Sequence, residues 1–217
     1  MISDSDLQQK VTEELHWEPS IDATHIGVAA KNGIVTLTGY VTRYIEKRNA
    51  ERAAERVADV KAVVDDIELK IPGASQRNDL DIAESSLTAL KLNALIPRER
   101  IKLAVENGWI TLDGEVDWQY QRIAVEDALK FMLGVKGITN KIMVKPVALI
   151  SDIQTKIRNA LIRNAQIDAS QITVETSGNK AILGGKVRSW AERQQAETAA
   201  WSAPGISNIE NNIHVNF

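Results

Sequence analysis

The chain of 217 residues contains no cysteine, so no disulfide, thiolate metal ligand or nucleophilic thiol is available to it. Histidine is nearly as scarce, because only His16, His25 and His214 occur and no two have the spacing of metal ligands. No HExxH, GxSxG or phosphate-loop pattern is found in the sequence. These absences predict a protein that is not an enzyme and that uses no cofactor or metal.

Long apolar runs and an excess of basic residues are also missing. No stretch approaches 18 consecutive apolar residues, so the sequence predicts no transmembrane helix. The formal net charge is −3, which does not favour nucleic acid as a partner. Residues 1–6 lack the basic and apolar regions of a signal peptide. We therefore expect a cytoplasmic protein, or a periplasmic one if the sequence is a trimmed mature form.

One sequence pattern occurs three times. It runs NGIVTLTGYV from Asn32, NGWITLDGEV from Asn107 and, less closely, NKAILGGKV from Asn179. Equivalent positions are 75 and then 71 residues apart. A repeat of this length predicts three small domains, which we place at residues 1–72, 76–146 and 148–217.

Each copy shows the same order of secondary-structure signals. Apolar residues four apart predict a helix, alternation around a tight turn predicts two strands, and an Ala-rich helix and a last alternating strand follow. Gly39, Gly114 and Gly185 end the second strand at a buried position, which predicts a bulge or a closely approaching helix. The order predicts an α+β fold of three tandem αββαβ domains, each a three-stranded mixed sheet with two helices on one face.

Polar residues predict several local features of the repeat. Three segments have the spacing of a helix capping box: Ser5-x-x-Gln8, Ser151-x-x-Gln154 and Ser189-x-x-Glu192. Asp65 and Asp66 align with asparagine and lysine in the sister copies, so we interpret them as a turn and not as an acid–base pair.

A second shared motif follows the Ala-rich helix. It reads GVKGITNKIMV from Gly134 and GISNIENNIHV from Gly205, while the first copy has Asp59 and Asp65 at the glycine and asparagine positions. With the strand motif, it resembles the BON domain family, named for bacterial OsmY and nodulation proteins. The resemblance implies three tandem BON domains. It also implies non-enzymatic modules of the bacterial cell envelope, linked to phospholipid surfaces, osmotic stress and attachment within larger assemblies.

Tryptophan marks the predicted binding surface. Trp109, Trp118 and Trp201 each align with a charged residue in a sister copy, and Trp190 aligns with a glutamine, so these rings are not expected in the core. Two interpretations of Trp118 and Trp190 stay open. Either ring forms a hydrophobic staple at the start of a helix, or it anchors the chain to a partner or a membrane.

Two modes of binding follow from these residues. Lys186, Arg188 and Arg193 lie around Trp190 in the sequence, a combination that favours anionic phospholipid headgroups. Domains with small cores, short linkers and surface tryptophans favour contacts between chains. Such contacts are head-to-tail if a repeat of one chain meets a different repeat of the next chain. We expect a binding or scaffolding protein that forms a homo-oligomer. The alternative is peripheral binding to anionic phospholipid through the third domain.

Overall fold

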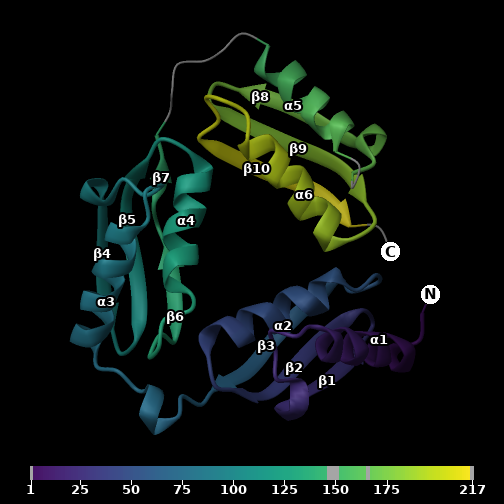
Figure 1. Ribbon diagram of the computed structural model, residues 1–217. Coiled ribbons are helices and arrows are strands. Elements are labelled where there is room, and N and C mark those ends of the chain that lie inside the picture. The colour runs from purple at the N-terminus through teal and green to yellow at the C-terminus, as the bar shows by residue number, and fades with distance from the viewer. Residues whose placement is uncertain (1, 146–151, 165–166, 216–217) are drawn as a thin grey trace.

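The computed structural model describes residues 2–145, 152–164 and 167–215, and the three repeats fold as three separate αββαβ units (Figure 1). The first domain contains α1 (Asp4–Trp17), β1 (Ile26–Lys31), β2 (Ile34–Val41), α2 (Tyr44–Arg56) and β3 (Ala62–Leu69). The middle domain contains α3 (Asp79–Leu92), β4 (Ile101–Glu106), β5 (Trp109–Val116), α4 (Gln119–Leu129), β6 (Gly137–Asn140) and β7 (Met143–Val144). The third domain contains α5 (Ile153–Arg163), β8 (Ile172–Ser177), β9 (Lys180–Val187), α6 (Trp190–Trp201) and β10 (Asn208–Val215).

The three sheets have one topology. In each, the second strand of the repeat is central, pairs antiparallel with the first and parallel with the third, and leaves those two strands at the edges. The middle domain differs because its third strand is divided into β6 and β7, which both pair with β5. The predicted α+β class, the mixed sheets and the element order are confirmed.

The cores follow the apolar periodicity of the sequence. The face of α1 with Leu7, Val11 and Leu15 is buried against its sheet, and the equivalent faces of α3 and α5 are buried in the same way. The second helices α2 and α6 bury alanines against the sheet, such as Ala50, Ala53 and Ala54 on α2, whereas α4 buries Val125 and Leu129. Every domain thus has its own apolar cluster, as the repeat length predicts.

The glycines at the ends of the central strands are required by a backbone contact, and not by a helix. Gly39 has φ +105°, and a Cβ atom added there would lie 1.9 Å from the carbonyl oxygen of His25. Gly114 and Gly185 also have positive φ, and an added Cβ would lie 2.1 and 2.0 Å from the corresponding carbonyl oxygens. The close approach predicted for a helix was therefore wrong. The chain just before each first strand takes that space.

One of the three expected capping boxes differs from the prediction, and another includes a residue that is not described. The N-cap of α1 is Ser3 and not Ser5, because the Ser3 hydroxyl accepts the amide of Asp6. The expected Ser151-x-x-Gln154 box falls on Ser151, which lies outside the described residues. Gln8 and Gln154 reach across to the edge strands, where their side-chain amides donate to the carbonyls of Val28 (2.7 Å) and Val174 (2.6 Å).

The starts of the second helices are held by one repeated position. Ser189 caps α6 as predicted, by accepting the Glu192 amide, and the Glu192 carboxylate accepts the Arg188 amide at 2.8 Å. Glu46 and Gln121 occupy the same position in the other copies and likewise accept amides of the residues just before α2 and α4. These interactions satisfy donors that a helix start leaves free.

The aspartates that we interpreted as a turn lie inside strand β3. The Asp65 carboxylate accepts the amide of Ile67 at 3.1 Å and pairs with Lys47 at 3.3 Å. Asn140 and Asn211 make the equivalent bond to the amide two residues on, and they lie beside arginines in place of Lys47. The turn interpretation was wrong for the backbone, although the local side-chain bond resembles that of an Asx turn.

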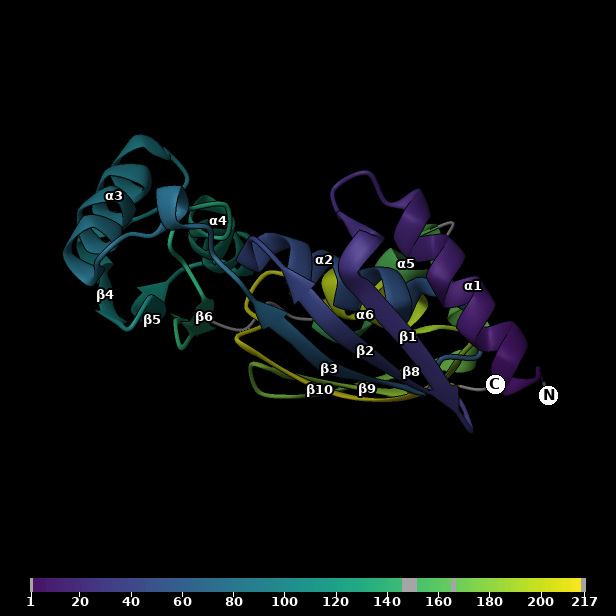
Figure 2. The ribbon, with the colours of Figure 1, turned by 90° about the horizontal axis from the view of Figure 1, so that it is seen from below.

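The second helices face one another across the centre of the molecule. Figure 1 shows α2, α4 and α6 turned inward, one from each domain. In the view from below, the middle domain lies to one side of the other two (Figure 2). This arrangement brings residues of the first and third domains together and places both against the middle domain.

Candidate functional site

Trp201 joins the third domain to the middle one. It is the last residue of α6, is half-buried, and packs against the apolar clusters of both domains. Its indole N–H points to the Glu197 carboxylate at 3.4 Å. The alignment predicts solvent exposure for this position in an isolated domain. In the whole chain, the surface that Trp201 meets is the neighbouring domain.

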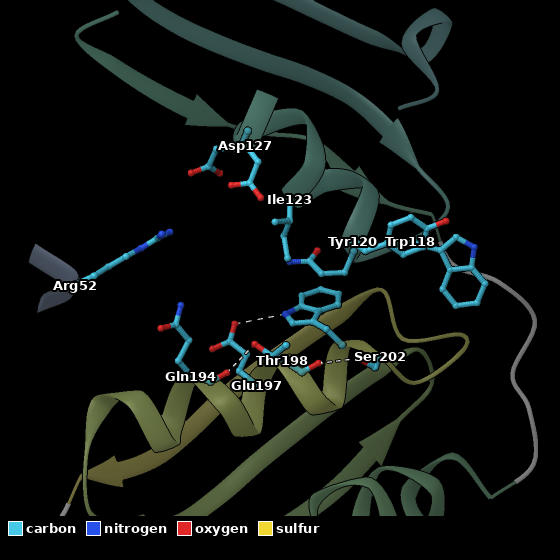
Figure 3. Close-up of a pocket in the computed structure, with 12 residues that line it drawn as sticks. Arg52, Trp118, Tyr120, Ile123, Asp127, Gln194, Glu197, Thr198 and Ser202 are labelled. Carbon is cyan, nitrogen blue, oxygen red and sulfur yellow. Dashed lines mark hydrogen bonds between the residues drawn. The ribbon is translucent and has the colours of Figure 1, made fainter. Parts of the chain in front are cut away.

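Trp118 and Trp201 line one groove between α4 and α6. The groove has a volume of about 680 Å³, and Tyr120 and Ile123 supply further apolar lining from α4 (Figure 3). Trp118 lies at the N-cap of α4 and keeps 38% of its surface exposed. Arg52 extends into the same space from α2. The structure thus brings two of the predicted tryptophans together at a meeting point of three domains.

The contact between the first and third domains is more polar. Trp190 opens α6 and is half-buried, and the Arg193 guanidinium lies over its ring at 5.2 Å. Both line a small cavity of about 240 Å³ against the charged residues of α2. There, burial raises the pKa of the Glu55 carboxyl, and nearby Glu51 raises it further. Trp190 therefore meets a helix of the first domain, and not open solvent.

The basic residues around Trp190 differ in what they contact. Arg193 donates to the carbonyls of Asn211 (2.7 Å) and Ile213 (3.1 Å), so it holds strand β10. Lys186 is exposed, and by strand alternation it lies on the sheet face opposite α6, because its neighbour in the chain is buried. Arg188 is exposed as well and pairs with Asp168 at 3.4 Å. Arg193 is thus engaged with β10, while Lys186 and Arg188 are the two basic residues of the predicted phospholipid site that stay exposed.

Trp109 lies on the open sheet face of the middle domain, as the alternation predicts. Its ring covers Gly137, where an added Cβ would come within 2.4 Å of it, and its N–H donates to Thr139 at 2.8 Å. The ring is still 49% exposed. Sequence reasoning overlooked Trp17, the most exposed tryptophan at 83%, which ends α1. Its exposure could have been predicted from the alignment, because Trp17 aligns with the charged Arg163.

Exposed apolar side chains gather on the middle domain. Of the fifteen large exposed ones in the described ranges, eleven belong to this domain, three to the first and one to the third. The eleven are Leu80, Leu87, Leu92, Leu95, Trp109, Trp118, Tyr120, Ile123, Phe131, Leu133 and Met143. Trp118, Tyr120 and Ile123 line the groove between α4 and α6, and the other eight lie outside it. Exposed apolar side chains that gather on one domain are typical of an interaction site.

The same positions are mostly polar in the sister domains. Leu87 on the outer side of α3 is matched by Thr12 on α1 and by Arg158 on α5. Phe131, just after α4, is matched by Arg56 and Ser202. Because the three domains share one fold, the apolar residues are not needed to build it. They are a property that distinguishes the middle domain.

In the described ranges, no group of three or more histidine and carboxylate side chains is placed to hold a metal ion. Among the helices that the structure describes, none has the length and apolar character needed to cross a bilayer.

One curated protein and two solved structures illustrate what this chain is similar to. Osmotically-inducible protein Y of Escherichia coli (strain K12) is 29% identical over 148 residues, which cover 66% of this chain and 74% of that protein. Two solved structures of CdsD, a structural protein of the Type III secretion system of Chlamydia trachomatis, match with a TM-score of 0.27 each. Their sequence identities are 17% and 15%, over 100% and 97% of this chain and 100% and 92% of theirs.

The family itself is shown by a model that matches three times in succession. The model described as BON domain matches residues 3–71, 78–146 and 150–216, which together span nearly the whole sequence. The resemblance read from the repeated motifs is thereby confirmed. This chain belongs to the BON domain family and carries three tandem copies of the domain.

Proposed function

We propose that this chain is a non-enzymatic scaffolding protein that associates with a second copy of itself through its middle domain. The observation that carries the proposal is the concentration of exposed apolar side chains on that domain, at positions that are mostly polar in the other two. Burying these side chains against another protein would remove them from water, at about 25 cal/mol per Å² of apolar surface. The third domain has only one large exposed apolar side chain in its described part, so it has less apolar surface to bury in a contact.

The asymmetry between domains also bears on the symmetry of the assembly. Head-to-tail contacts between different domains need complementary surfaces on both, and they lead to rings or filaments. Here one domain carries most of the apolar surface, which favours a contact between two middle domains. Such a contact uses the same patch on both copies and closes as a two-fold dimer.

The mass of the protein in solution tests the proposal. Native mass spectrometry and light scattering of the full chain should give twice 24.0 kDa at micromolar concentration. The variant L80S/L87R carries residues found at the equivalent positions 5 and 158, which the fold accepts, and it should be a monomer with an unchanged circular dichroism spectrum.

A matched change in the first domain serves as the control. Thr12 occupies the position of Leu87, so T12R should leave the mass at two chains. A wild-type mass of one chain up to high concentration would overturn the proposal. Equal dimer affinity in wild type and L80S/L87R would show that these leucines are not the contact.

A second candidate is peripheral binding to anionic phospholipid through the third domain. The observation in its favour is that Lys186 and Arg188 both remain exposed at the end of β9. Vesicle flotation tests it. The wild type should float with phosphatidylglycerol vesicles and not with phosphatidylcholine vesicles, and K186E/R188E should float with neither. Flotation that is equal in the variant and the wild type would reject these two residues as the site.

A further inference from the structure

Each sheet has a free edge at its first strand, and two of the three edges are covered by a glutamine. Gln8 donates to the Val28 carbonyl of β1, and Gln154 donates to the Val174 carbonyl of β8. An exposed edge is a template for another strand, and proteins commonly protect it. The glutamines occupy an acceptor that a further strand would use.

The edge of the middle domain lacks this protection. Ala83 stands at the position of Gln8 and Gln154, and Leu103 at that of Val28 and Val174. An alanine side chain has no group that can donate a hydrogen bond, so it cannot cover the Leu103 carbonyl. Instead of a polar cap, the outer side of α3 presents Leu80 and Leu87, one turn before and one turn after Ala83, and both are exposed.

The equivalence of the domains tells which backbone groups of β4 face the free edge. In domain one the carbonyl bound by Gln8 belongs to Val28, so the same side of β4 carries the N–H and C=O groups of Leu103. In an antiparallel strand these directions alternate, and Ile101 and Val105 therefore face the edge as well. A second antiparallel strand would form its hydrogen bonds at these residues.

From these observations we infer that strand β4 pairs antiparallel with β4 of a second copy, about a two-fold axis at Ala104. This inference rests on the proposed self-association and names the element that makes it. The axis places Leu103 opposite Val105 of the other copy as a hydrogen-bonded pair. Ala104 then meets its own copy, and Lys102 meets Glu106, in the pairs whose side chains lie closest together.

Charge complementarity favours β4 over the other two first strands. With β4 paired on itself, Lys102 of each copy lies opposite Glu106 of the other, and both side chains are exposed. The same pairing in β8 would set Glu175 directly against its own copy, a like-charge contact that destabilises a sheet. In β1 it would set Lys31 against Gly27, which offers no charge.

The helix above the strand obeys the same symmetry. An antiparallel crossing of two α3 helices near Ala83 places Leu80 of one copy beside Leu87 of the other. The small side chain of Ala83 lets the two helices approach closely at the axis. The dimer would then hold one continuous sheet of six strand positions covered by an apolar helix pair.

Disulfide trapping tests the pairing, and the natural absence of cysteine makes every introduced thiol unique. The full-length variant A104C should form a disulfide-linked dimer under mild oxidation, because the two Cβ atoms meet on the axis at a separation suited to the bond. A29C places the thiol at the same position of β1 and should stay unlinked at the same concentration. E175C does so for β8 and should also stay unlinked.

Charge reversal and a restored cap supply two further readouts. K102E should weaken the dimer about tenfold, because two like-charge contacts with Glu106 replace two opposite-charge ones, and K102E/E106K should recover it. A83Q should lower the dimer affinity by a similar factor, because it installs the cap of the sister domains. A dimer by mass in which A104C fails to cross-link, or in which K102E and A83Q change nothing, would overturn the β4 pairing and leave the proposed self-association standing. A one-chain mass would overturn both.

Discussion

The middle domain and its two neighbours share a backbone but differ in what they present to their surroundings. In all three, a glycine ends the central strand against a carbonyl oxygen, and a glutamate or glutamine binds the amides before the second helix. Yet α1 and α5 each expose one large apolar side chain, Trp17 and Ile162, while α3 exposes Leu80, Leu87 and Leu92. The comparison separates residues that build the fold from residues that are left free to bind.

The middle domain also differs in its position in the chain. It packs against Tyr44 from the first domain and Trp201 from the third, which both lie on its apolar cluster. At this contact, burial raises the pKa of the Tyr44 phenol. The domain with the most exposed apolar surface is therefore also the one that its neighbours hold from two sides.

The largest expected effect comes from breaking the shared backbone in one domain at a time. G114A should destabilise the middle domain by about 3 kcal/mol, because the new Cβ cannot fit beside the Arg100 carbonyl at positive φ. Thermal unfolding followed by circular dichroism measures the loss, and the mass of the protein should fall to one chain. G39A has the same steric conflict in the first domain.

The two glycine variants together sharpen the comparison. G39A should lower the stability of the first domain by a similar amount, but it should leave the dimer formed by the middle domain in place. If G39A and G114A abolish the dimer equally, the association does not belong to the middle domain alone.

A smaller loss is expected when the link between domains is cut. W201A should cost about 2 kcal/mol, less than the 3–5 kcal/mol typical of a fully buried aromatic ring, because Trp201 is only half-buried. Amide hydrogen exchange should rise in both α6 and α4. W17A is the matched control, since that ring is 83% exposed and its removal should change neither stability nor exchange.

An effect of W201A confined to α6 would show that the ring serves its own domain only. The expected spread to α4 follows from the contact of Trp201 with the apolar clusters of both domains.

The fold was predictable because the sequence repeats. Three copies indicate which apolar positions are constant, and Leu7, Ile82 and Ile153 are all buried as that constancy predicts. The glycine was recognised as special, but its reason was not, because a carbonyl 14 residues earlier in the chain is invisible to a pattern of alternation. The cap of α1 was misplaced for a local reason: two serines, Ser3 and Ser5, lie at its start, and only the geometry of the backbone selects Ser3.

The candidate site was less predictable, because it depends on how the domains meet. Alignment showed that Trp201 does not belong to its own core, but not that the middle domain would cover it. Sequence proximity grouped Lys186 with Trp190, although strand alternation separates them. Alignment of the three copies identified the exposed tryptophans, and the same alignment identifies the leucines of α3, since Leu87 aligns with Thr12 and Arg158. The sequence prediction considered aromatic residues only and therefore missed these leucines.

The smallest expected effect concerns the one turn where the first domain departs from its sisters. Asp59 has φ +73°, in the left-handed region that Gly134 and Gly205 occupy at the same position. An aspartate tolerates this region at some cost, and glycine does not incur that cost. D59G should therefore stabilise the first domain by about 0.5 kcal/mol, measured by denaturant unfolding. The reverse change, G134D, should cost more than D59G gains, because a Cβ there would lie 2.8 Å from the Cβ of Arg77. Equal and opposite effects would mean that φ alone governs this turn, while the structure predicts that the crowding by Arg77 makes glycine necessary in the middle domain.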